Sequence, residues 1–326
     1  ESGRAAASEQ AMRTQPPPDF QNVHLILNPG SGSFPGRDEL PIDPNWTIHE
    51  VGDDGPKELA ERAVADGADL VIAAGGDGTV NATAHGLLDS DAVLGIVPMG
   101  TANVLATSLG VPSDLYDAMQ LIRTPDATSV RTIDAGAYGE DGEDFFMLRL
   151  GLGVEASMVA HSDDKLKAKV GRLAYLKTYL DEVRQQDPVR YHITTDGETH
   201  TTRGMTCLVC NTGHTGMRGL DLLPSVAIDD GKLTAVVIRR MGIGLMFALL
   251  WSAIVSFFKG NGFRAEQSER LRLYPGQSVR VTSDPPQDAA CDGEELRDIT
   301  TLDAHVLPAA LRVLVPVEKD DLPSER

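Results

Sequence analysis

Short, uninterrupted apolar runs alternate with helical patterns in the first part of the chain. Three runs break directly into turns that contain glycine, namely Val23–Leu27, Leu70–Ala74 and Val93–Val97. Helical spacing marks three further segments, Pro56–Asp66, Val80–Leu88 and Thr101–Leu109. Because continuous apolar strands that alternate with helices are typical of a buried parallel sheet, we expect an α/β domain with helices on both faces of its sheet.

The pattern changes to alternating apolar and polar positions after residue 128. The alternating runs are Arg131–Tyr138, Phe145–Leu150, Val189–Thr195, Leu233–Arg240 and Ser278–Thr282. Such alternation predicts a mainly antiparallel, β-sandwich-like second domain. Two helical segments, near Val170–Val183 and Met241–Phe258, are expected as insertions in it.

The predicted elements divide the chain of 326 residues into two domains and their extensions. Residues 1–19 are rich in Ala, Gln and Pro and lack an apolar signal-peptide core, which predicts a disordered leader. The α/β domain is expected over residues 20–128 and the β-rich domain over residues 129–310. The apolar segment 311–317 predicts a strand that returns to the first domain, and residues 318–326 form a polar tail.

Charge and cysteine content exclude several classes of function. The formal net charge of -19 would repel nucleic acid, so no nucleic-acid partner is expected. The three cysteines are too few for a disulfide framework, which favours a reducing compartment and a cytoplasmic protein. Cys207 and Cys210 lie in an apolar run and lack a second pair of metal ligands, so we interpret them as buried structural thiols.

Polar and glycine residues collect where the predicted parallel strands end. Asn28 follows the first strand, Gly75–Thr79 follows the second, and Pro98–Asn103 follows the third. Parallel sheets bind ligands beyond the carboxyl ends of their strands, and backbone N–H groups at a helix start attract anions. These loops therefore predict a phosphate site. The alternative is that they are ordinary turns, with glycine at positive φ and threonine as a cap.

Five motifs taken together resemble the diacylglycerol kinase catalytic domain family, which includes bacterial lipid kinases and sphingosine and ceramide kinases. They are Asn28–Gly32, Gly75–Thr79, Pro98–Asn103, the segment from Pro224 through Asp229–Leu233, and Asp292–Glu294. The resemblance implies an ATP-dependent lipid kinase that uses Mg²⁺ and has its active-site cleft between an α/β domain and a β-sandwich-like domain. It implies nucleotide contacts from Asn28, Gly75, Gly76, Asp77, Gly78, Thr79, Gly100, Thr101 and Asn103.

Two acidic turns in the second domain are the further candidate sites. Asp292 and Glu294 would share a face if they lay in a strand, and a carboxylate can accept the proton of a lipid hydroxyl. The alternative is a plain hairpin turn with a solvated Glu294. The resemblance gives Asp292 and Glu294 the catalytic role and leaves open which of them is the base. It also implies a structural Mg²⁺ site at Asp229, Asp230 and Leu233, although Ser225 stands where the family often has another Asp.

Three other positions depart from the family pattern and keep alternatives open. Ser33 replaces a frequent Lys, Ala82 a frequent Glu, and Val104 a frequent Asp. An NAD-kinase-like nucleotide kinase would share the Gly75–Thr79 motif. A catalytically silent lipid- or nucleotide-binding relative would explain the departures.

A lipid kinase must meet its substrate at a membrane, and two segments suggest how. Four basic residues would contact anionic headgroups: Lys165, Lys167, Lys169 and Arg172. The uncharged run Met241–Phe258 predicts a packed helix with an exposed apolar edge rather than a membrane span. We therefore expect a cytoplasmic protein peripherally associated with the membrane. Its expected acceptor is diacylglycerol, giving phosphatidic acid, and a homodimer is considered as a further assembly.

Overall fold

The computed structural model describes residues 14–139, 142–153, 187–214, 223, 225–239, 271–296 and 301–317. These residues form two compact units, one reaching to Ile133 and resuming at Ala309, the other lying between Asp134 and Pro308. The chain passes from one unit to the other within strands β6 (Thr128–Tyr138) and β17 (Thr301–Pro316). The predicted helices near 170–183 and 241–258, the basic cluster at 165–172 and the tail 318–326 lie outside the described residues.

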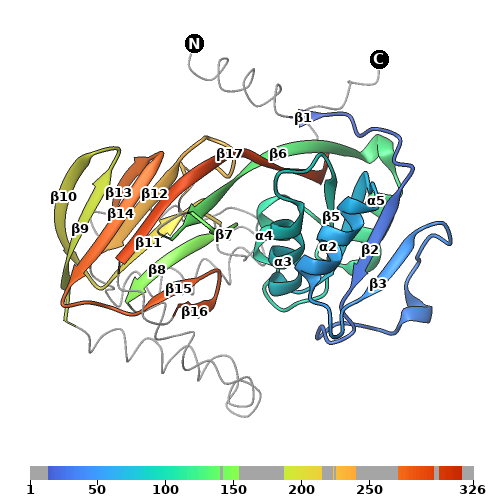
Figure 1. Ribbon diagram of the computed structural model, residues 1–326, viewed down its shortest axis with the longest axis horizontal. Helices are drawn as coiled ribbons and strands as arrows, with labels where there is room; N and C mark the ends of the chain where they lie inside the picture. Colours follow the sequence, from blue (N-terminus) through green and yellow to red (C-terminus); the bar gives the residue numbers. More distant parts are fainter. Residues whose placement is uncertain are drawn as a thin grey trace, which may run out of the picture. The chain divides into compact units, whose positions relative to one another are not determined.

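The first unit is built on a parallel sheet whose strand order is β17–β5–β4–β2–β3 (Figure 1). Its other strands are β2 (Val23–Leu27), β3 (Thr47–Glu50), β4 (Leu70–Gly75) and β5 (Val93–Pro98). Every residue of β4 and β5 is buried, which explains why both strands are continuous apolar runs in the sequence.

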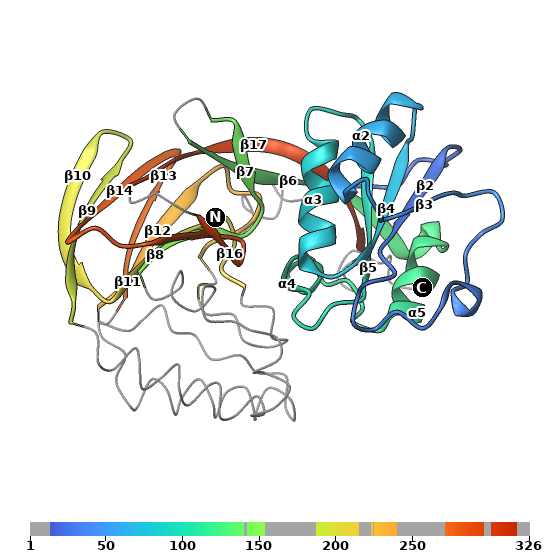
Figure 2. The same ribbon diagram turned by 60° about the horizontal axis from the view of Figure 1, so that its bottom comes forward.

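Helices cover both sides of this sheet. They are α2 (Pro56–Ala65), α3 (Asp77–Leu87), α4 (Val104–Ser108) and α5 (Leu115–Ile122). Figure 2 shows α2 and α3 on one side and α5 on the other. The helix predicted over Thr101–Leu109 is shorter than expected, because Asn103 adopts a left-handed conformation and α4 begins only at Val104. Two short 3₁₀ turns, η1 (Arg37–Glu39) and η2 (Pro125–Ala127), complete this unit.

The second unit is an antiparallel β-sandwich of two sheets. One has the order β13–β12–β11–β8–β15–β16, and the other runs β10–β9–β14–β17. The first sheet comprises β8 (Arg149–Gly153), β11 (Thr206–Cys210), β12 (Leu233–Ile238), β13 (Leu271–Gly276), β15 (Ala289–Cys291) and β16 (Glu294–Leu296). The second adds β9 (Val189–Thr195), β10 (Glu198–Gly204) and β14 (Ser278–Asp284) to β17.

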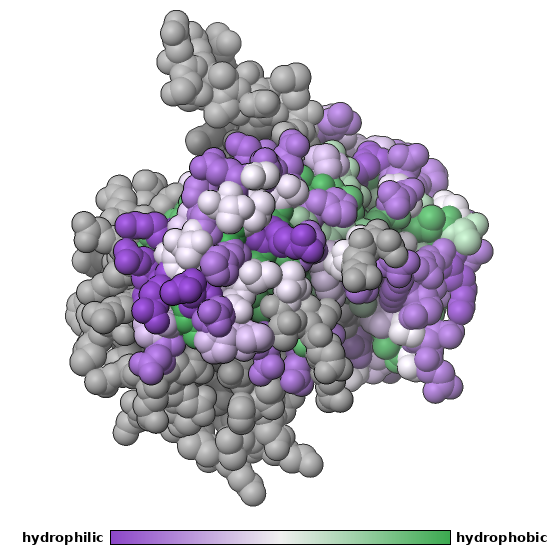
Figure 3. All heavy atoms as spheres, turned by 60° about the vertical axis from the view of Figure 1, so that its left-hand side comes forward, coloured by the Kyte–Doolittle hydropathy of each residue, from purple (hydrophilic) through white to green (hydrophobic). Residues whose placement is uncertain are grey.

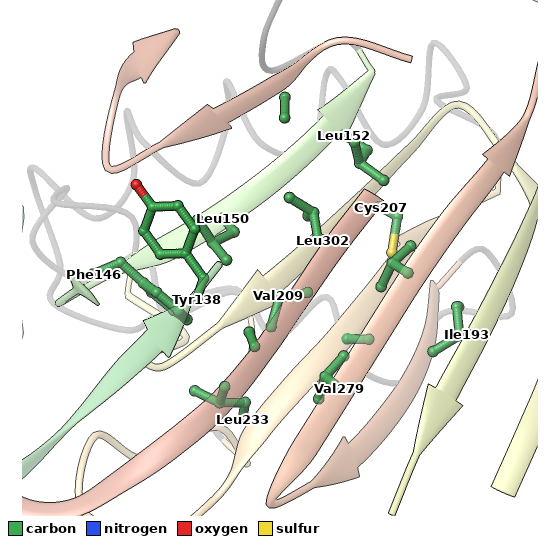
Figure 4. Close-up of a cluster of buried hydrophobic side chains, with 14 of the residues drawn as sticks. Tyr138, Phe146, Leu150, Leu152, Ile193, Cys207, Val209, Leu233, Val279 and Leu302 are labelled. Carbon is green, nitrogen blue, oxygen red and sulfur yellow. The ribbon is translucent and has the colours of Figure 1, made fainter. Parts of the chain in front are cut away.

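Alternating side chains from both sheets form the core of the sandwich. Figure 4 shows Leu150 and Val209 from one sheet in the same cluster as Val279 and Leu302 from the other. Polar residues such as those of β10 lie on the outer surface (Figure 3). The predicted fold class, an α/β domain followed by an antiparallel β-sandwich-like domain, is confirmed.

Two local expectations from the sequence are wrong. The alternating run Phe145–Leu150, predicted as one strand, contains the end of β7 (Asp144–Phe146) and the start of β8. Thr14 and Gln15, placed in a disordered leader, form β1 and pair with Arg131 and Val130 of β6. Backbone pairing needs no apolar side chain, so composition gave no sign of it.

The segment 311–317 returns to the parallel sheet, but it is not a separate strand. It is the end of the long strand β17, whose first half pairs with β14 of the sandwich. Arg312 and Val313 pair with β5 in parallel. The start of this strand at Thr301 could not be located from the apolar segment alone, because its first half alternates between buried and exposed residues.

Candidate active site

Three loops of the first unit lie at one edge of the parallel sheet. Asn28 follows β2, Gly76 joins β4 to α3, and Asn103 precedes α4 after β5. The strands are in parallel register, with Leu27 opposite Ala74. The structure therefore brings these loops together.

Hydrogen bonds tie the first loop to the other two. The Asn28 side-chain amide donates to the Thr79 hydroxyl over 2.8 Å, and the Asn28 carboxamide oxygen accepts from the Gly30 N–H. The Ser33 N–H donates to the Met99 carbonyl over 3.1 Å. Ser33 contributes through its backbone here, so this contact does not depend on the departure from the family's Lys.

Asp77 connects the second loop to the third. Its carboxylate accepts hydrogen bonds from the N–H groups of Asn103, over 2.8 Å, and Val104. N–H groups at the start of a helix have no acceptor within the helix, so Asp77 caps α4 from a distant part of the chain. Val104 takes part through its backbone N–H, so this contact does not depend on its side chain.

Close packing requires glycine at two of the loop positions, Gly75 and Gly100. A Cβ on Gly100 would lie 2.7 Å from the Cα of Gly76, and one on Gly75 would lie 2.4 Å from Thr79. Neither Gly75, Gly76, Gly78 nor Gly100 has a positive φ, so that part of the ordinary-turn alternative is wrong. A Cβ on Gly78 would meet nothing within 4 Å, and Thr101 is exposed. Gly78 and Thr101 are thus open to a ligand.

In the second unit, Asp292 and Gly293 form the two-residue turn between β15 and β16. Their φ angles are 46° and 94°, and Cys291 pairs with Glu294 across the hairpin. The expectation that Asp292 and Glu294 share one strand face is therefore wrong, because strand alternation does not apply within a turn. Glu294 is exposed, whereas Asp292 is half-buried.

The Asp292 carboxylate is fixed by a segment far away in the sequence. It accepts hydrogen bonds from the backbone N–H groups of Met147, Leu148 and Arg149 over 2.8, 3.0 and 2.7 Å. Burial raises the pKa of Asp292 to about 6, and these N–H groups keep it from rising further. Three hydrogen bonds thus hold a carboxylate whose pKa lies above its ordinary value.

The second acidic turn, Asp229–Gly231, is also held by a buried carboxylate. Asp134 accepts the Gly231 N–H over 2.7 Å, and Asp230 accepts the Lys232 N–H over 2.9 Å. Burial raises the pKa of Asp230, and the neighbouring carboxylates of Asp134 and Asp229 add to the rise. Leu233 follows as the first residue of β12.

The donors at this turn are of the right chemical kind for Mg²⁺, since Mg²⁺ prefers oxygen ligands. However, no group of three or more His, Cys, Asp or Glu side chains in the described part of the chain is arranged to hold a metal ion. Among the described residues, the acidic side chains at this turn do not by themselves make up a metal site.

None of the three cysteines forms a disulfide, and all three are buried. Burial raises the pKa of the Cys207 and Cys291 thiols. Neutral, enclosed thiols are poor nucleophiles and poor metal ligands, in keeping with a structural role.

Asn211 is a residue of this region that the sequence analysis missed. It is fully buried and follows the apolar strand β11 directly. Its side-chain amide donates to the carbonyl groups of Asp134 and Met147, each over 2.9 Å. The available signal was a carboxamide side chain at the end of an apolar run, which alone does not indicate a role.

Comparisons with known proteins agree with these features. Residues 22–135 match the model of the diacylglycerol kinase catalytic domain, and residues 149–315 match that of the YegS C-terminal NAD kinase beta sandwich-like domain. A protein of Stenotrophomonas maltophilia named "Probable lipid kinase YegS-like" is 30% identical over 84% of this chain and 89% of its own. A Staphylococcus aureus diacylglycerol kinase is 27% identical over 68% of this chain and 72% of its own.

A solved structure shows the same fold. The crystal structure of a Bacillus anthracis diacylglycerol kinase matches with a TM-score of 0.66 at 21% identity, covering 94% of this chain and 100% of that one. The two matching domain models together account for most of the chain, in the order that the fold shows. The chain is a lipid kinase of the diacylglycerol kinase type and belongs to the family of YegS-like and diacylglycerol kinases.

Proposed function

We propose that this chain transfers the γ-phosphoryl group of ATP to the hydroxyl of diacylglycerol, giving phosphatidic acid and ADP. The observation that carries the proposal is the half-buried Asp292 carboxylate, which is held by three backbone N–H groups and has a pKa of about 6. A general base works best when its pKa lies near the working pH. A carboxylate of ordinary pKa would accept a proton less readily.

Asp292 acts as the proton acceptor in this proposal. As the lipid oxygen forms its bond to the γ-phosphorus, the bond from that phosphorus to the β-γ bridging oxygen of ATP breaks and ADP leaves. The hydroxyl proton passes to Asp292, which later releases it to water. Glu294, the second candidate carboxylate, is exposed and is not assigned the proton transfer in this proposal.

The three loops of the first unit are proposed to bind ATP, which brings Mg²⁺ with it. The exposed Thr101 and the open side of Gly78 supply the surface, and Asn28 and Asn103 hold the loops in place. Asp77 is proposed to act by setting the position of the third loop, since its carboxylate already binds two N–H groups there. Backbone N–H groups next to glycine suit phosphate because no Cβ prevents approach.

The lipid is proposed to be reached at the cytoplasmic membrane surface by peripheral association. No helix among the described residues is long and apolar enough to cross a membrane. Replacement of the four basic residues at 165–172 by Gln should weaken binding to anionic vesicles and leave turnover of a short-chain, water-soluble diacylglycerol unchanged. Equal vesicle binding by that variant would remove the basic cluster from the docking surface.

The deciding experiment is a phosphotransfer assay with labelled ATP. Mixed micelles containing diacylglycerol, sphingosine or ceramide, and separately NAD, serve as acceptors. We expect labelled phosphatidic acid from the wild-type protein, and roughly 10²–10⁴-fold slower labelling by Asp292→Asn. Label in NADP would support the nucleotide-kinase alternative. ATP binding without a labelled product would support a silent relative, as the Ser33 and Ala82 departures allow.

A further inference from the structure

Asn211 lies at the centre of a buried hydrogen-bond network in the second unit. Its side-chain amide nitrogen donates to two carbonyl oxygens, those of Asp134 and Met147, and its backbone N–H donates to the Leu148 carbonyl over 2.9 Å. The side chain has no exposed surface. All three bonds join the end of β11 to segments more than 60 positions away.

The residues Met147–Arg149, which we call the strap, are held from both directions. Asn211 binds the carbonyl groups of Met147 and Leu148. The N–H groups of the same strap bind the Asp292 carboxylate. A peptide segment whose carbonyls are fixed has its N–H groups fixed as well, because each peptide unit is planar.

We propose that Asn211 is a positioning residue that holds the strap against Asp292 and thereby fixes the proton acceptor of the reaction. The expected effect of Asn211 on the reaction rests on the proposed function. Its role in holding the strap rests only on the hydrogen bonds. Asn211 touches no reacting atom in this arrangement and acts through the strap.

The chemistry of the Asn side chain suits this position. Its planar amide carries two N–H donors, and both accepting carbonyls lie within hydrogen-bond distance. Alanine would leave these buried carbonyls without the amide, and serine offers one donor on a shorter side chain. An aspartate would supply no donor and would place a charge against two carbonyl oxygens.

Loss of the amide has a definite consequence for Asp292. A loosened strap gives weaker N–H donation to the carboxylate. Those hydrogen bonds favour the ionised form, so the pKa of Asp292 should rise above about 6 when they weaken. The acceptor must be ionised to work, so the acidic limb of the profile of kcat/KM against pH should move to higher pH.

The test compares Asn211→Ala and Asn211→Ser with the matched control Thr206→Val. Thr206 lies on the preceding strand β11 and donates a buried hydrogen bond of 2.8 Å to the Leu152 carbonyl, a bond of similar kind that does not involve the strap. Two readouts are measured: the kcat/KM profile on diacylglycerol micelles, and titration of Asp carboxyl ¹³C signals, with Asp292 assigned by its absence in Asp292→Asn.

We expect both readouts to move upward by about one pH unit in Asn211→Ala and by less in Asn211→Ser, with Thr206→Val unchanged. An unmoved Asp292 titration in a folded Asn211 variant overturns the inference, and so does an equal shift in Thr206→Val. If Asn211→Ala does not fold, Asn211→Ser decides by the same criterion. A wild-type protein without kinase activity would refute the proposed function, and the ¹³C titration would still decide the role of Asn211.

Discussion

Replacing Asp292 with Asn should lower activity while changing how stability depends on pH. The substitution keeps the shape of the side chain and removes the proton acceptor. Loss of a general base costs roughly 10²–10⁴ in kcat. The same change removes a desolvated charge from the folded state, so the difference in stability between the variant and the wild type should depend on pH.

The stability effect follows from the raised pKa. In the folded chain the Asp292 pKa is about 6, against the ordinary value of 3.8. The folded state therefore binds this proton more tightly than the unfolded chain, and the wild-type protein loses stability as pH rises from about 4 to about 7. Roughly two pKa units at ~1.36 kcal/mol each give an upper value of ~3 kcal/mol.

Asp292→Asn should not lose stability in this way as pH rises, because its carboxamide does not titrate. The new side chain would still leave one strap N–H without its carboxylate oxygen, at a cost of ~1–3 kcal/mol that changes little with pH. The free energy of unfolding of Asp292→Asn, minus that of the wild type, should therefore increase by up to ~3 kcal/mol between pH 4 and pH 7.

Urea unfolding at a series of pH values from about 4 to about 8, followed by circular dichroism, measures this difference. Glu294→Gln is the matched control, because its carboxylate is exposed and close to Asp292 in the same hairpin. A difference that stays constant across this pH range would contradict the burial argument. Retained kcat in Asp292→Asn would move the base role elsewhere.

Three further predictions concern the first unit. Gly100→Ala should destabilise the fold by ~1–3 kcal/mol, since its Cβ would lie 2.7 Å from a backbone Cα. Gly78→Ala should not destabilise it, since its Cβ would meet nothing within 4 Å, and thermal unfolding compares the two variants. Asp77→Ala should weaken ATP binding measured by calorimetry, because the N–H groups at the start of α4 lose their cap. An unchanged Kd for ATP would exclude this loop from the ATP site. Burial lowers the pKa of the stacked pair His24 and His49, so the folded state resists their protonation and stability should fall as pH drops below ~6.5. When both histidines are replaced by Gln, the Tm should fall less than that of the wild type as pH drops through ~6.5. An equal fall in Tm would mean that protonation of these histidines does not lower the stability.

The sequence by itself predicted the fold class and the location of the first-unit loops. Residues buried on both faces of a parallel sheet must be continuously apolar, so Leu70–Ala74 and Val93–Val97 indicate their strands directly. Parallel strands place their carboxyl ends at one edge, which is why Asn28, Asp77 and Asn103 could be expected together. The local sequence pattern was sufficient here, because each loop directly follows the apolar run that indicates its strand.

The contacts of Asp292 were decided only by the tertiary structure. The sequence indicated an acidic turn, but the partners of that carboxylate are backbone N–H groups more than 140 positions away. Every residue except proline carries the same backbone N–H, so no side-chain pattern reveals which one will bind a carboxylate. For the same reason the pattern predicts one continuous strand over Phe145–Leu150, where the strap interrupts it. The burial that raises the Asp292 pKa, and the role of Asn211 behind the strap, arise from packing of strands distant in sequence, which depends on the whole sandwich rather than on any segment of the chain.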